Sequence, residues 1–330
     1  MTFPSIAVVG AGGIGGVVAW SLARAGLSPT VIARGRSADA LRRDGLTIER
    51  HGRRETVRVA VASPDDDIGL QDMVLGTMKA HDWPSAMPLL KRLIGPSTTL
   101  IPAINGIPWW YFAGQSEPAA PDTLSCLDPA GAMTSGIDPA GLVGCVVYMG
   151  ATRMGPGCID WSSGRRLVLG DVIPRRDGRL SRIAELLRQA NLDIVETDDI
   201  RQEVWTKLLG NGVFNPLSVV ASATMDEMID DPSLRHICVA AMNELIAVAG
   251  SVGIALPVDA EQRLAMNGHM RGFRTSTLQD FEAGRPLEIA ALVEAPCAIG
   301  AANGVDTPVL TVLGRLVTRF AIAQRGAAHA

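Results

Sequence analysis

The sequence predicts an α/β protein, with an N-terminal doubly wound, mostly parallel sheet followed by a second, all-helical C-terminal domain. The chain has 330 residues, and domains of about 150 residues give an expectation of about two. In the first half, short apolar runs alternate with helix-like segments, which is typical of βαβ units. After about Gly170 nearly all segments have the pattern of helices. Two kinds of architecture therefore follow each other along the chain.

The first half is expected to form short buried strands separated by helices. Each strand candidate is a short apolar run, and each helix candidate carries apolar residues at helical spacing. The expected strands are residues 5–9, 30–33, 73–78, 98–103 and 143–151, and the expected helices are residues 13–25, 37–43 and 83–94. Residues 47–49 and 56–62 flank a polar turn at 51–54. They predict an antiparallel hairpin inserted into the βαβ order.

The domain boundary is expected within residues 171–178, a polar segment that contains proline and glycine. This gives an N-terminal domain of residues 1–174 and a C-terminal domain of residues 175–330. In the second domain, Asp231-Pro232 and Thr307-Pro308 are typical of a helix start, with proline at the first helical position. The expected helices there are residues 232–250 or 232–253, 276–283, 288–303 and 308–324.

Charge and hydropathy exclude two classes of partner. The formal net charge is −4 and the isoelectric point is near 5.8, so there is no basic field for nucleic acid phosphates. The apolar stretch 6–25 follows a start without lysine or arginine and is interrupted by glycines. It predicts neither a signal peptide nor a membrane span. We therefore expect no nucleic acid and no membrane partner.

Cysteine and histidine usage indicates neither a disulfide framework nor a metal site. The five cysteines are an odd number without a C-x-x-C pair, and the five histidines lack the spacing of metal ligands. Free cysteines favour a reducing compartment. We expect a cytoplasmic protein without a metal ion.

A glycine-rich motif follows the first expected strand and opens the first expected helix. In a G-x-G-x-x-G motif the first glycine permits a tight turn, the second lets a pyrophosphate approach the backbone, and the third lets the helix pack on the strand. The motif consists of Gly10, Ala11, Gly12, Gly13, Ile14 and Gly15. In this context it predicts a Rossmann-type domain that binds a dinucleotide.

The end of the second expected strand favours one form of the dinucleotide. Arg34 stands about where an acidic residue would bind the ribose 2′-hydroxyl of NAD. A guanidinium is instead suited to the additional phosphate of NADP. The sequence therefore predicts NADPH as the cofactor, while the nearby Asp39 leaves NAD open.

Three polar residues share one face of an expected helix in the second half. Lys207, Asn211 and Asn215 lie at i, i+4 and i+8, so their side chains line up. A positioned lysine can protonate the alkoxide that hydride transfer to a ketone produces, and the neutral amides can hold oxygen atoms without competing for the proton. The pattern indicates a ketone reductase. Pro216 is expected to perturb or end this helix near Asn215.

Five blocks of sequence occur in a recognisable order over nearly the whole chain. They are the glycine motif with Arg34, Lys79 after a strand, Asn105-Gly106 after the next strand, the Lys207 face, and residues 276–280 followed by 284–289. Together they resemble the ketopantoate reductase (2-dehydropantoate 2-reductase) family. The resemblance implies a Rossmann domain and a helical domain with the active site in the cleft between them. It also implies NADPH-dependent reduction of 2-dehydropantoate to (R)-pantoate, in pantothenate and coenzyme A synthesis.

The resemblance implies a role for each of these polar residues. Lys207 would be the general acid, and Glu288 would lie beside it and contact the substrate hydroxyl. Asn105 would contact both the nicotinamide ribose and the substrate, and Lys79 would lie on the cofactor side. The residues that would hold the substrate are Asn211, Asn215 and Ser276. The partner is then a small 2-oxo acid, and a homodimer is compatible with the resemblance.

The segment after Asn105 leaves the substrate open. Trp109, Trp110, Tyr111 and Phe112 are four aromatic residues in a row, in a chain with few aromatics. Either they pack in a core or interface, or they line the cleft and reshape it. In the second case the substrate would be another branched or aromatic 2-oxo acid. A third reading, a non-catalytic module that senses NADPH, requires only the nucleotide pocket and leaves the lysine face unexplained.

Overall fold

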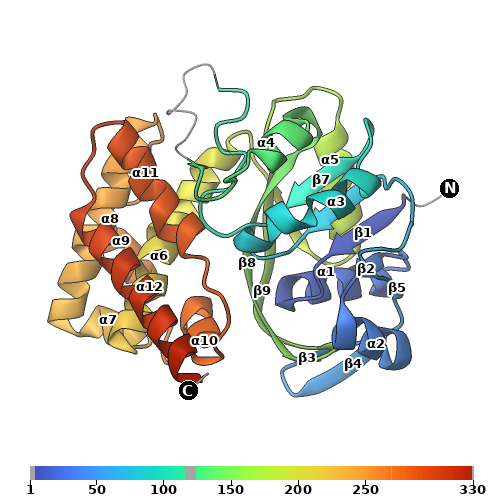
Figure 1. Ribbon diagram of the computed structural model, residues 1–330, viewed down its shortest axis with the longest axis horizontal. Helices are drawn as coiled ribbons and strands as arrows, with labels where there is room; N and C mark the ends of the chain where they lie inside the picture. The colour runs from blue at the N-terminus through green and yellow to red at the C-terminus, as the bar shows by residue number, and fades with distance from the viewer. Residues whose placement is uncertain (1–3, 116–123, 269, 329–330) are drawn as a thin grey trace. The chain divides into compact units, whose positions relative to one another are not determined.

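The computed structural model describes residues 4–115, 124–268 and 270–328 (Figure 1). The chain divides into two compact units. Unit 1 consists of Met1–Ile104 and Ala132–Ile200, and unit 2 consists of Asn105–Gly131 and Arg201–Ala330. No helix within the described ranges is both long enough and apolar enough to cross a membrane.

Unit 1 alternates strands and helices. Its strands are β1 (Ile6–Val9), β2 (Thr30–Ile32), β3 (Leu46–Arg50), β4 (Arg53–Val57), β5 (Ala60–Ala62), β6 (Met73–Gly76), β7 (Thr99–Pro102), β8 (Val143–Gly155), β9 (Cys158–Asp171) and β10 (Asp193–Glu196). Its helices are α1 (Gly13–Arg24), α2 (Gly35–Asp44), α3 (Trp83–Leu93), α4 (Ala132–Gly136) and α5 (Arg179–Gln189), with short 3-10 turns at Ala80–Asp82 and Pro139–Gly141.

The first sheet is parallel and confirms the expected Rossmann-like architecture. Its strand order is β5-β2-β1-β6-β7, with β1 pairing in parallel with both β2 and β6. All four residues of β1, β6 and β7 are buried, which explains why these strands are continuous apolar runs rather than alternating ones. The strand order reverses direction between β1 and β6, and ligands of such sheets bind at this point, outside the carboxyl ends of the strands.

A second sheet departs from the sequence expectation. Its order is β10-β9-β3-β4, and β8 pairs antiparallel with β9. The expected hairpin is present as β3 and β4, but residues 60–62 form the separate strand β5, which pairs in parallel with β2 in the first sheet. Strands β9 and β10 were not expected. Because β10 pairs with β9, the polar segment 171–178 connects β9 to α5 inside unit 1, and unit 1 extends to Ile200.

Helix α1 lies between the two sheets, and its glycines allow the close approach. A Cβ atom at Gly15 would overlap the carbonyl oxygen of Gly10, at the end of β1. On the other side, a Cβ at Gly16 would lie 2.6 Å from a side-chain carbon of Ile159 on β9. Both positions therefore need glycine for packing. The buried residues Val17, Val18 and Leu22 complete the contact of α1 with the core of unit 1.

All secondary structure in the described part of unit 2 is helical, as the sequence predicts. The helices are α6 (Ile200–Ala221), α7 (Met225–Asp230), α8 (Pro232–Ser251), α9 (Ala260–Asn267), α10 (Ser276–Glu282), a π-helical turn (Ala290–Glu294), α11 (Ala295–Ala302) and α12 (Pro308–Ala328). The Asp231 carboxylate accepts hydrogen bonds from the backbone amides of Ser233 and Leu234, so the expected N-cap of α8 is present.

One of the two expected effects of Pro216, an end of helix α6 near Asn215, is wrong. Helix α6 does not end near Asn215 but continues through Pro216 to Ala221. On either side of the proline, Val213, Phe214 and Leu217 are fully buried. The free energy of burying this apolar surface outweighs the backbone hydrogen bond that proline cannot make.

Candidate functional site

The glycine-rich turn in unit 1 has the form that a pyrophosphate requires. Gly10 has a φ of +108°, a conformation open to glycine and costly for other residues. A Cβ added to Gly12 would meet no atom within 4 Å, so open space adjoins the backbone at the start of α1. Gly12 is the N-cap of α1, and no described side chain caps this end. The backbone amide groups at the start of α1 are therefore suited to binding an anion.

A threonine that the sequence analysis did not identify supports this turn. Thr77 is one residue past β6. Its hydroxyl donates to the carbonyl oxygens of Val9, at 3.1 Å, and Gly10, at 2.9 Å. It thereby joins the carboxyl ends of β1 and β6, where the strand order reverses. No local pattern marks Thr77, because its partners lie 67 and 68 residues away.

The remaining residues of the motif pack around the turn. Gly13 lies against β8, where a Cβ atom would overlap the carbonyl of Ala151. Ala11 and Ile14 are half-buried and pack against the core of unit 1. The motif thus combines a packed side, at Gly13, with an open side, at Gly12.

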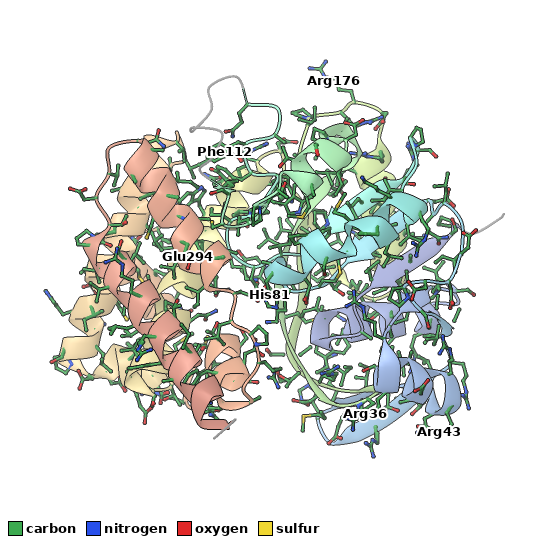
Figure 2. All side chains as sticks on the ribbon, viewed as in Figure 1. Arg36, Arg43, His81, Phe112, Arg176 and Glu294 are labelled. Carbon is green, nitrogen blue, oxygen red and sulfur yellow. The ribbon has the colours of Figure 1, made fainter. Side chains whose placement is uncertain are left out.

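Arg34 lies two residues after β2 and is the N-cap of α2. Its side chain is exposed and makes no hydrogen bond or ion pair with the residues that the structure describes. Asp39, the residue that left NAD open, lies on α2 near Arg42, with 3.8 Å between the charged atoms. Arg36 and Arg43 are also exposed on α2 (Figure 2). Arg34 and Arg36 therefore place two guanidinium groups just after the end of β2, whereas Arg43 lies at the far end of α2.

Lys79 also belongs to unit 1. It follows β6 by three residues, is half-buried, and is the N-cap of the short turn Ala80–Asp82. Its position at the carboxyl end of a central strand of the parallel sheet is where such folds hold ligands.

Unit 2 holds the other predicted site residues, and α6 positions three of them. Lys207, Asn211 and Asn215 lie along one face of this helix, spread over about 12 Å at 1.5 Å per residue. Lys207 and Asn211 are half-buried, whereas Asn215 is only 5% exposed. The expectation that these residues share a helix face is confirmed.

The structure brings Lys207 into contact with Asn105. The Nζ atom of Lys207 donates to Oδ1 of Asn105 at 2.5 Å. A hydrogen bond from an ammonium group to an amide oxygen orients the amine without placing a negative charge beside it. The pair therefore presents a fixed cationic group, which is the requirement for stabilising and protonating an alkoxide.

The Asn105 segment is held in place by an irregularity in a distant helix. In the π-helical turn, the amide of Ala295 bonds to the carbonyl of Ala290, and the next possible donor, residue 296, is a proline without an N–H. The carbonyl oxygen of Ala291 therefore has no donor within its helix. It instead accepts a hydrogen bond from the amide of Ile107 at 2.9 Å.

Gly106 makes this docking feasible. Its φ is +79°, and a Cβ atom there would overlap the carbonyl group of Ala291. In the dipeptide Asn105-Gly106, Asn105 carries the polar side chain, and Gly106 lets the backbone approach the Ala291 carbonyl closely enough to hold the segment in place. The sequence analysis noted the dipeptide but not the π-helical turn, for which Pro296 is the available signal.

Glu288 begins the chain segment that leads into the π-helical turn. Its side chain is only 7% exposed, and its carbonyl oxygen accepts from the amide of Leu292 at 3.1 Å. Glu288 therefore lies in the interior of unit 2 and not on its surface.

Ser276 is linked to the α6 face through its neighbour. The hydroxyl of Thr275 lies 2.7 Å from that of Ser218, a buried residue on α6. Thr275, and not Ser276, is the N-cap of α10, since its hydroxyl accepts from the amide of Leu278. The exposed Ser276 is therefore not needed as a cap. Asp280 pairs with Arg285 at 2.7 Å, which is a structural role.

The aromatic segment packs inside unit 2. Tyr111 is fully buried, and its hydroxyl accepts from Nε1 of Trp205 on α6 at 2.7 Å. Arg201 binds the carbonyl oxygens of Tyr111 and Ala113 at 2.7 and 2.6 Å. Trp110 is also buried, at 2% exposure. These contacts favour core packing over the alternative in which the aromatic rings line a cleft, and Arg201 is a structural residue that the sequence analysis missed.

Within the described ranges, which omit His269 and His329, no three potential metal ligands come together. All five cysteines are free.

Comparisons with known proteins identify the family of this chain. Residues 6–173 match the family model described as ketopantoate reductase PanE/ApbA, and residues 199–321 match the model of its C-terminal part. A 2-dehydropantoate 2-reductase from Mesorhizobium japonicum is 35% identical over 322 residues, which cover 97% of this chain and 98% of that protein.

Solved structures extend the same result. A Ralstonia solanacearum protein, provisionally described as a ketopantoate reductase, is 36% identical, with a TM-score of 0.92 and coverage of 98% of this chain and 99% of that chain. A D-mandelate dehydrogenase, solved with NADH and anilino(oxo)acetate, shares the fold at 19% identity, with a TM-score of 0.83 and coverage of 97% and 99%. The chain therefore belongs to the ketopantoate reductase family of oxidoreductases.

Proposed function

We propose that this protein reduces 2-dehydropantoate to (R)-pantoate with NADPH, in the synthesis of pantothenate and coenzyme A, and that Lys207 is the general acid. The observation that carries this proposal is the 2.5 Å hydrogen bond from Lys207 to Asn105. It holds an ammonium group on the α6 face that also carries Asn211 and Asn215. Such a group is what carbonyl reduction requires.

The chemistry follows from charge development at the carbonyl. A bound NADPH supplies the hydride that adds to the carbonyl carbon. The carbonyl oxygen then becomes an alkoxide, which the Lys207 ammonium stabilises and protonates. Asn105 accepts one hydrogen bond from the Lys207 ammonium group, which carries three N–H groups. A carboxylate at position 105 would instead compete for the proton.

The substrate has a carboxylate, a ketone and a hydroxyl to be held. Asn211 and Asn215 can donate to carboxylate oxygens, because each amide carries two N–H groups. Ser276 is exposed at the start of α10, beside the threonine that bonds to α6. Glu288 is buried and accepts hydrogen bonds when ionised, so it suits the substrate hydroxyl. In this assignment Lys207 and Glu288 are catalytic, and Asn105, Asn211, Asn215 and Ser276 bind the substrate.

The cofactor assignment depends on the glycine-rich turn and Arg34. The open space at Gly12 and the uncapped start of α1 suit the pyrophosphate. The exposed Arg34 at the end of β2 suits the additional phosphate of NADPH, whereas Asp39 is close to Arg42. Lys79, Asn105 and the motif residues Gly10–Gly15 complete the proposed cofactor set.

A related reductase of another branched or aromatic 2-oxo acid is the alternative. The D-mandelate dehydrogenase shares the fold, so the architecture is compatible with an aromatic substrate. However, Trp109 and Trp110 are buried, which supports core packing over an aromatic-lined pocket. The third interpretation, a non-catalytic NADPH sensor, does not explain the hydrogen bond between Lys207 and Asn105.

A substrate panel tests the proposal. NADPH oxidation is measured with 2-dehydropantoate and with branched and aromatic 2-oxo acids of similar size. The expected result is the highest kcat/KM for 2-dehydropantoate. If another 2-oxo acid exceeds it by about tenfold or more, which corresponds to about 1.4 kcal/mol of transition-state binding, the pantoate assignment is wrong and that acid class replaces it.

A further inference from the structure

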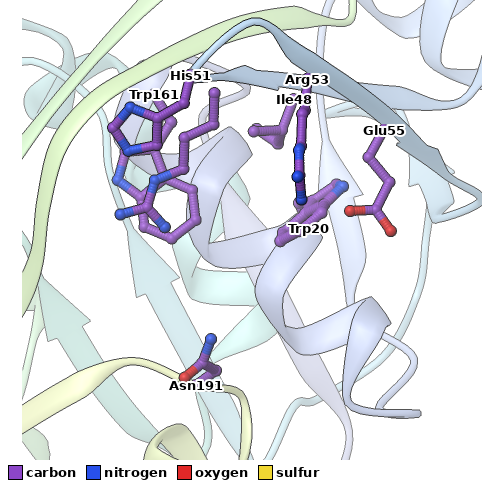
Figure 3. Close-up of a pocket in the computed structure, with 8 residues that line it drawn as sticks. Trp20, Ile48, His51, Arg53, Glu55, Trp161 and Asn191 are labelled. Atoms are coloured by element: carbon purple, nitrogen blue, oxygen red, sulfur yellow. The ribbon is translucent and has the colours of Figure 1, made fainter.

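Unit 1 contains a cavity of about 650 Å³ at the opposite end of α1 from the glycine-rich turn. It lies between the second half of α1, the β3–β4 hairpin and β9 (Figure 3). In Figure 3, His51 and Trp161 lie on one side, Trp20 and Arg53 on the other, and Asn191 extends from below toward the space between them. The volume falls in the range of small-molecule sites.

Two tryptophans give the cavity a fixed aromatic wall. The rings of Trp20 and Trp161 meet edge to face, with 6.3 Å between centroids and 73° between planes. Trp161 is buried, and its Nε1 donates to the carbonyl of Gly164 at 2.6 Å, so this ring cannot rotate freely. A rigid aromatic wall binds planar groups at a low cost in conformational entropy.

Two guanidinium groups give the cavity a positive charge. Arg50 lies over the Trp161 ring, with its central carbon 3.9 Å from the ring centroid. Neither Arg50 nor Arg53 forms an ion pair with the residues that the structure describes. The acidic residue at the cavity, Glu55, pairs with Arg24. Two positive charges therefore remain uncompensated beside an aromatic wall, and they would attract an anion.

Two residues that line the cavity have a positive φ although neither is a glycine. His51 has a φ of +50° in the turn between β3 and β4, and Asn191 has a φ of +59° after α5. Within the described ranges, the chain has one other non-glycine residue with positive φ, Ser222. Local structure accounts for both: His51 and Gly52 form the two-residue turn between β3 and β4, and Asn191 ends α5, where the amide of Leu192 bonds to the carbonyl of Leu187.

The Asn191 amide is already oriented by a neighbour. Its Oδ1 accepts from Arg165 at 2.9 Å. The amide nitrogen is thereby turned toward the cavity (Figure 3), where its N–H groups can donate to a ligand.

This cavity is separate from the proposed cofactor site. Trp20 lies seven residues after Gly13 on α1, which is about 10 Å at 1.5 Å per residue. The cofactor residues Gly12 and Arg34 do not line it. Its ligand is therefore not accounted for by the reductase activity.

We propose that this cavity binds a small planar anion, an aromatic ring that carries a carboxylate or a phosphate. The ring packs against Trp20, beside the stacked Arg50 and Trp161, and the anionic group pairs with Arg50 and Arg53. An aromatic carboxylate and a mononucleotide share this chemistry. The inference does not depend on the substrate or on the role of Lys207.

Calorimetric titration with two probes tests the proposal. Naphthalene-2-carboxylate and adenosine monophosphate are titrated into the full chain at saturating NADPH, so that the proposed cofactor site is occupied. The neutral analogues naphthalene-2-carboxamide and adenosine are titrated in parallel. At least one anion is expected to bind with a Kd below about 1 mM, and at least about fivefold more tightly than its neutral analogue. The anion with the lower Kd shows whether the natural ligand is an aromatic carboxylate or a mononucleotide.

Matched variants locate the binding. Arg50→Gln and Arg53→Gln should each weaken the anion by about fivefold or more, because each removes one charge from the cavity. Arg54→Gln is the control, since Arg54 adjoins Arg53 on β4, faces the other side of the strand, and donates to Cys158. It should change the Kd by less than about twofold. Arg53 is exposed, so its variant should fold even if Arg50→Gln does not.

Three results would overturn the proposal. The first is no binding of either anion up to about 10 mM. The second is equal binding of an anion and its neutral analogue. The third is an unchanged Kd in Arg53→Gln, which would place the bound anion elsewhere.

Discussion

The Nζ atom of Lys207 and the Oδ1 atom of Asn105 are 2.5 Å apart, although 102 residues separate them in the chain. Lys207 is fixed by helix α6, whereas Asn105 is fixed by a neighbouring amide that bonds to the carbonyl of Ala291. The pair thus depends on two independent backbone supports. Its geometry is the basis of the predictions on catalysis below.

Replacing Lys207 by alanine should lower kcat by at least about a hundredfold, because the alkoxide loses its proton donor and its cationic stabilisation. The Kd for NADPH should change little. Steady-state kinetics and a cofactor titration measure both quantities. Lys91→Ala, which removes an exposed lysine on α3, should leave both unchanged. A kcat of Lys207→Ala close to that of the wild type would exclude Lys207 as the acid.

Asn105→Asp should change the pH dependence of the reaction. A carboxylate beside Lys207 stabilises the ammonium form and holds its proton more tightly. The basic limb of the kcat/KM profile should therefore move to higher pH, while the plateau should fall by about tenfold or more. Asn105→Ala, which removes the acceptor without adding charge, should lower the plateau without that upward shift. Identical profiles for the two variants would show that Asn105 does not act through Lys207.

Arg34→Gln should weaken NADPH by about tenfold or more and NADH by less than about twofold, because only NADPH carries the additional phosphate. Fluorescence titration with both cofactors measures the difference. Arg43→Gln is a suitable control, since Arg43 is exposed at the far end of α2 and pairs with Asp44 at 2.7 Å. Equal losses for both cofactors in Arg34→Gln would remove Arg34 from the phosphate site.

Gly106→Ala should destabilise the protein and reduce activity together. Gly106 and Gly26 both have a φ of +79°, but a Cβ at Gly26 meets nothing within 4 Å, whereas one at Gly106 overlaps the Ala291 carbonyl. Both variants should lose about 1–2 kcal/mol from backbone strain. Gly106→Ala should lose a further roughly 1–3 kcal/mol from the clash, and its kcat should fall as Asn105 moves. Equal melting temperatures for the two variants would contradict the proposed docking.

Burial raises the pKa of the Cys238 thiol to about 12, through loss of hydration in the interior of unit 2. A raised pKa lowers the thiolate fraction, and thiolate is the reactive form. At about pH 8, Cys238 should therefore resist alkylation by iodoacetamide in the folded protein and react when the protein is unfolded. Peptide mass spectrometry measures this. Rapid labelling in the native state would contradict the packing of α8.

Several parts of the site could be predicted from local sequence, and others could not. The glycine-rich motif and the Lys207 face are both encoded within a few residues, where spacing alone decides which side chains align. The continuation of α6 through Pro216 could not be predicted, because it depends on burial of the flanking apolar residues by other helices. The strand β10 was missed because four residues with mixed burial carry no periodic signal.

The sequence by itself determined the alternation of strands and helices up to β7, the helical nature of the chain from α6 onward, and the residue types available for chemistry. These depend on short-range preferences and on hydrophobic spacing. Only the tertiary structure decided that Ala291 binds Ile107, that Asn105 meets Lys207, and that the Trp110 segment is buried. The physical reason is that each of these contacts joins segments that lie far apart in the chain, and the free energy of packing the whole unit selects them.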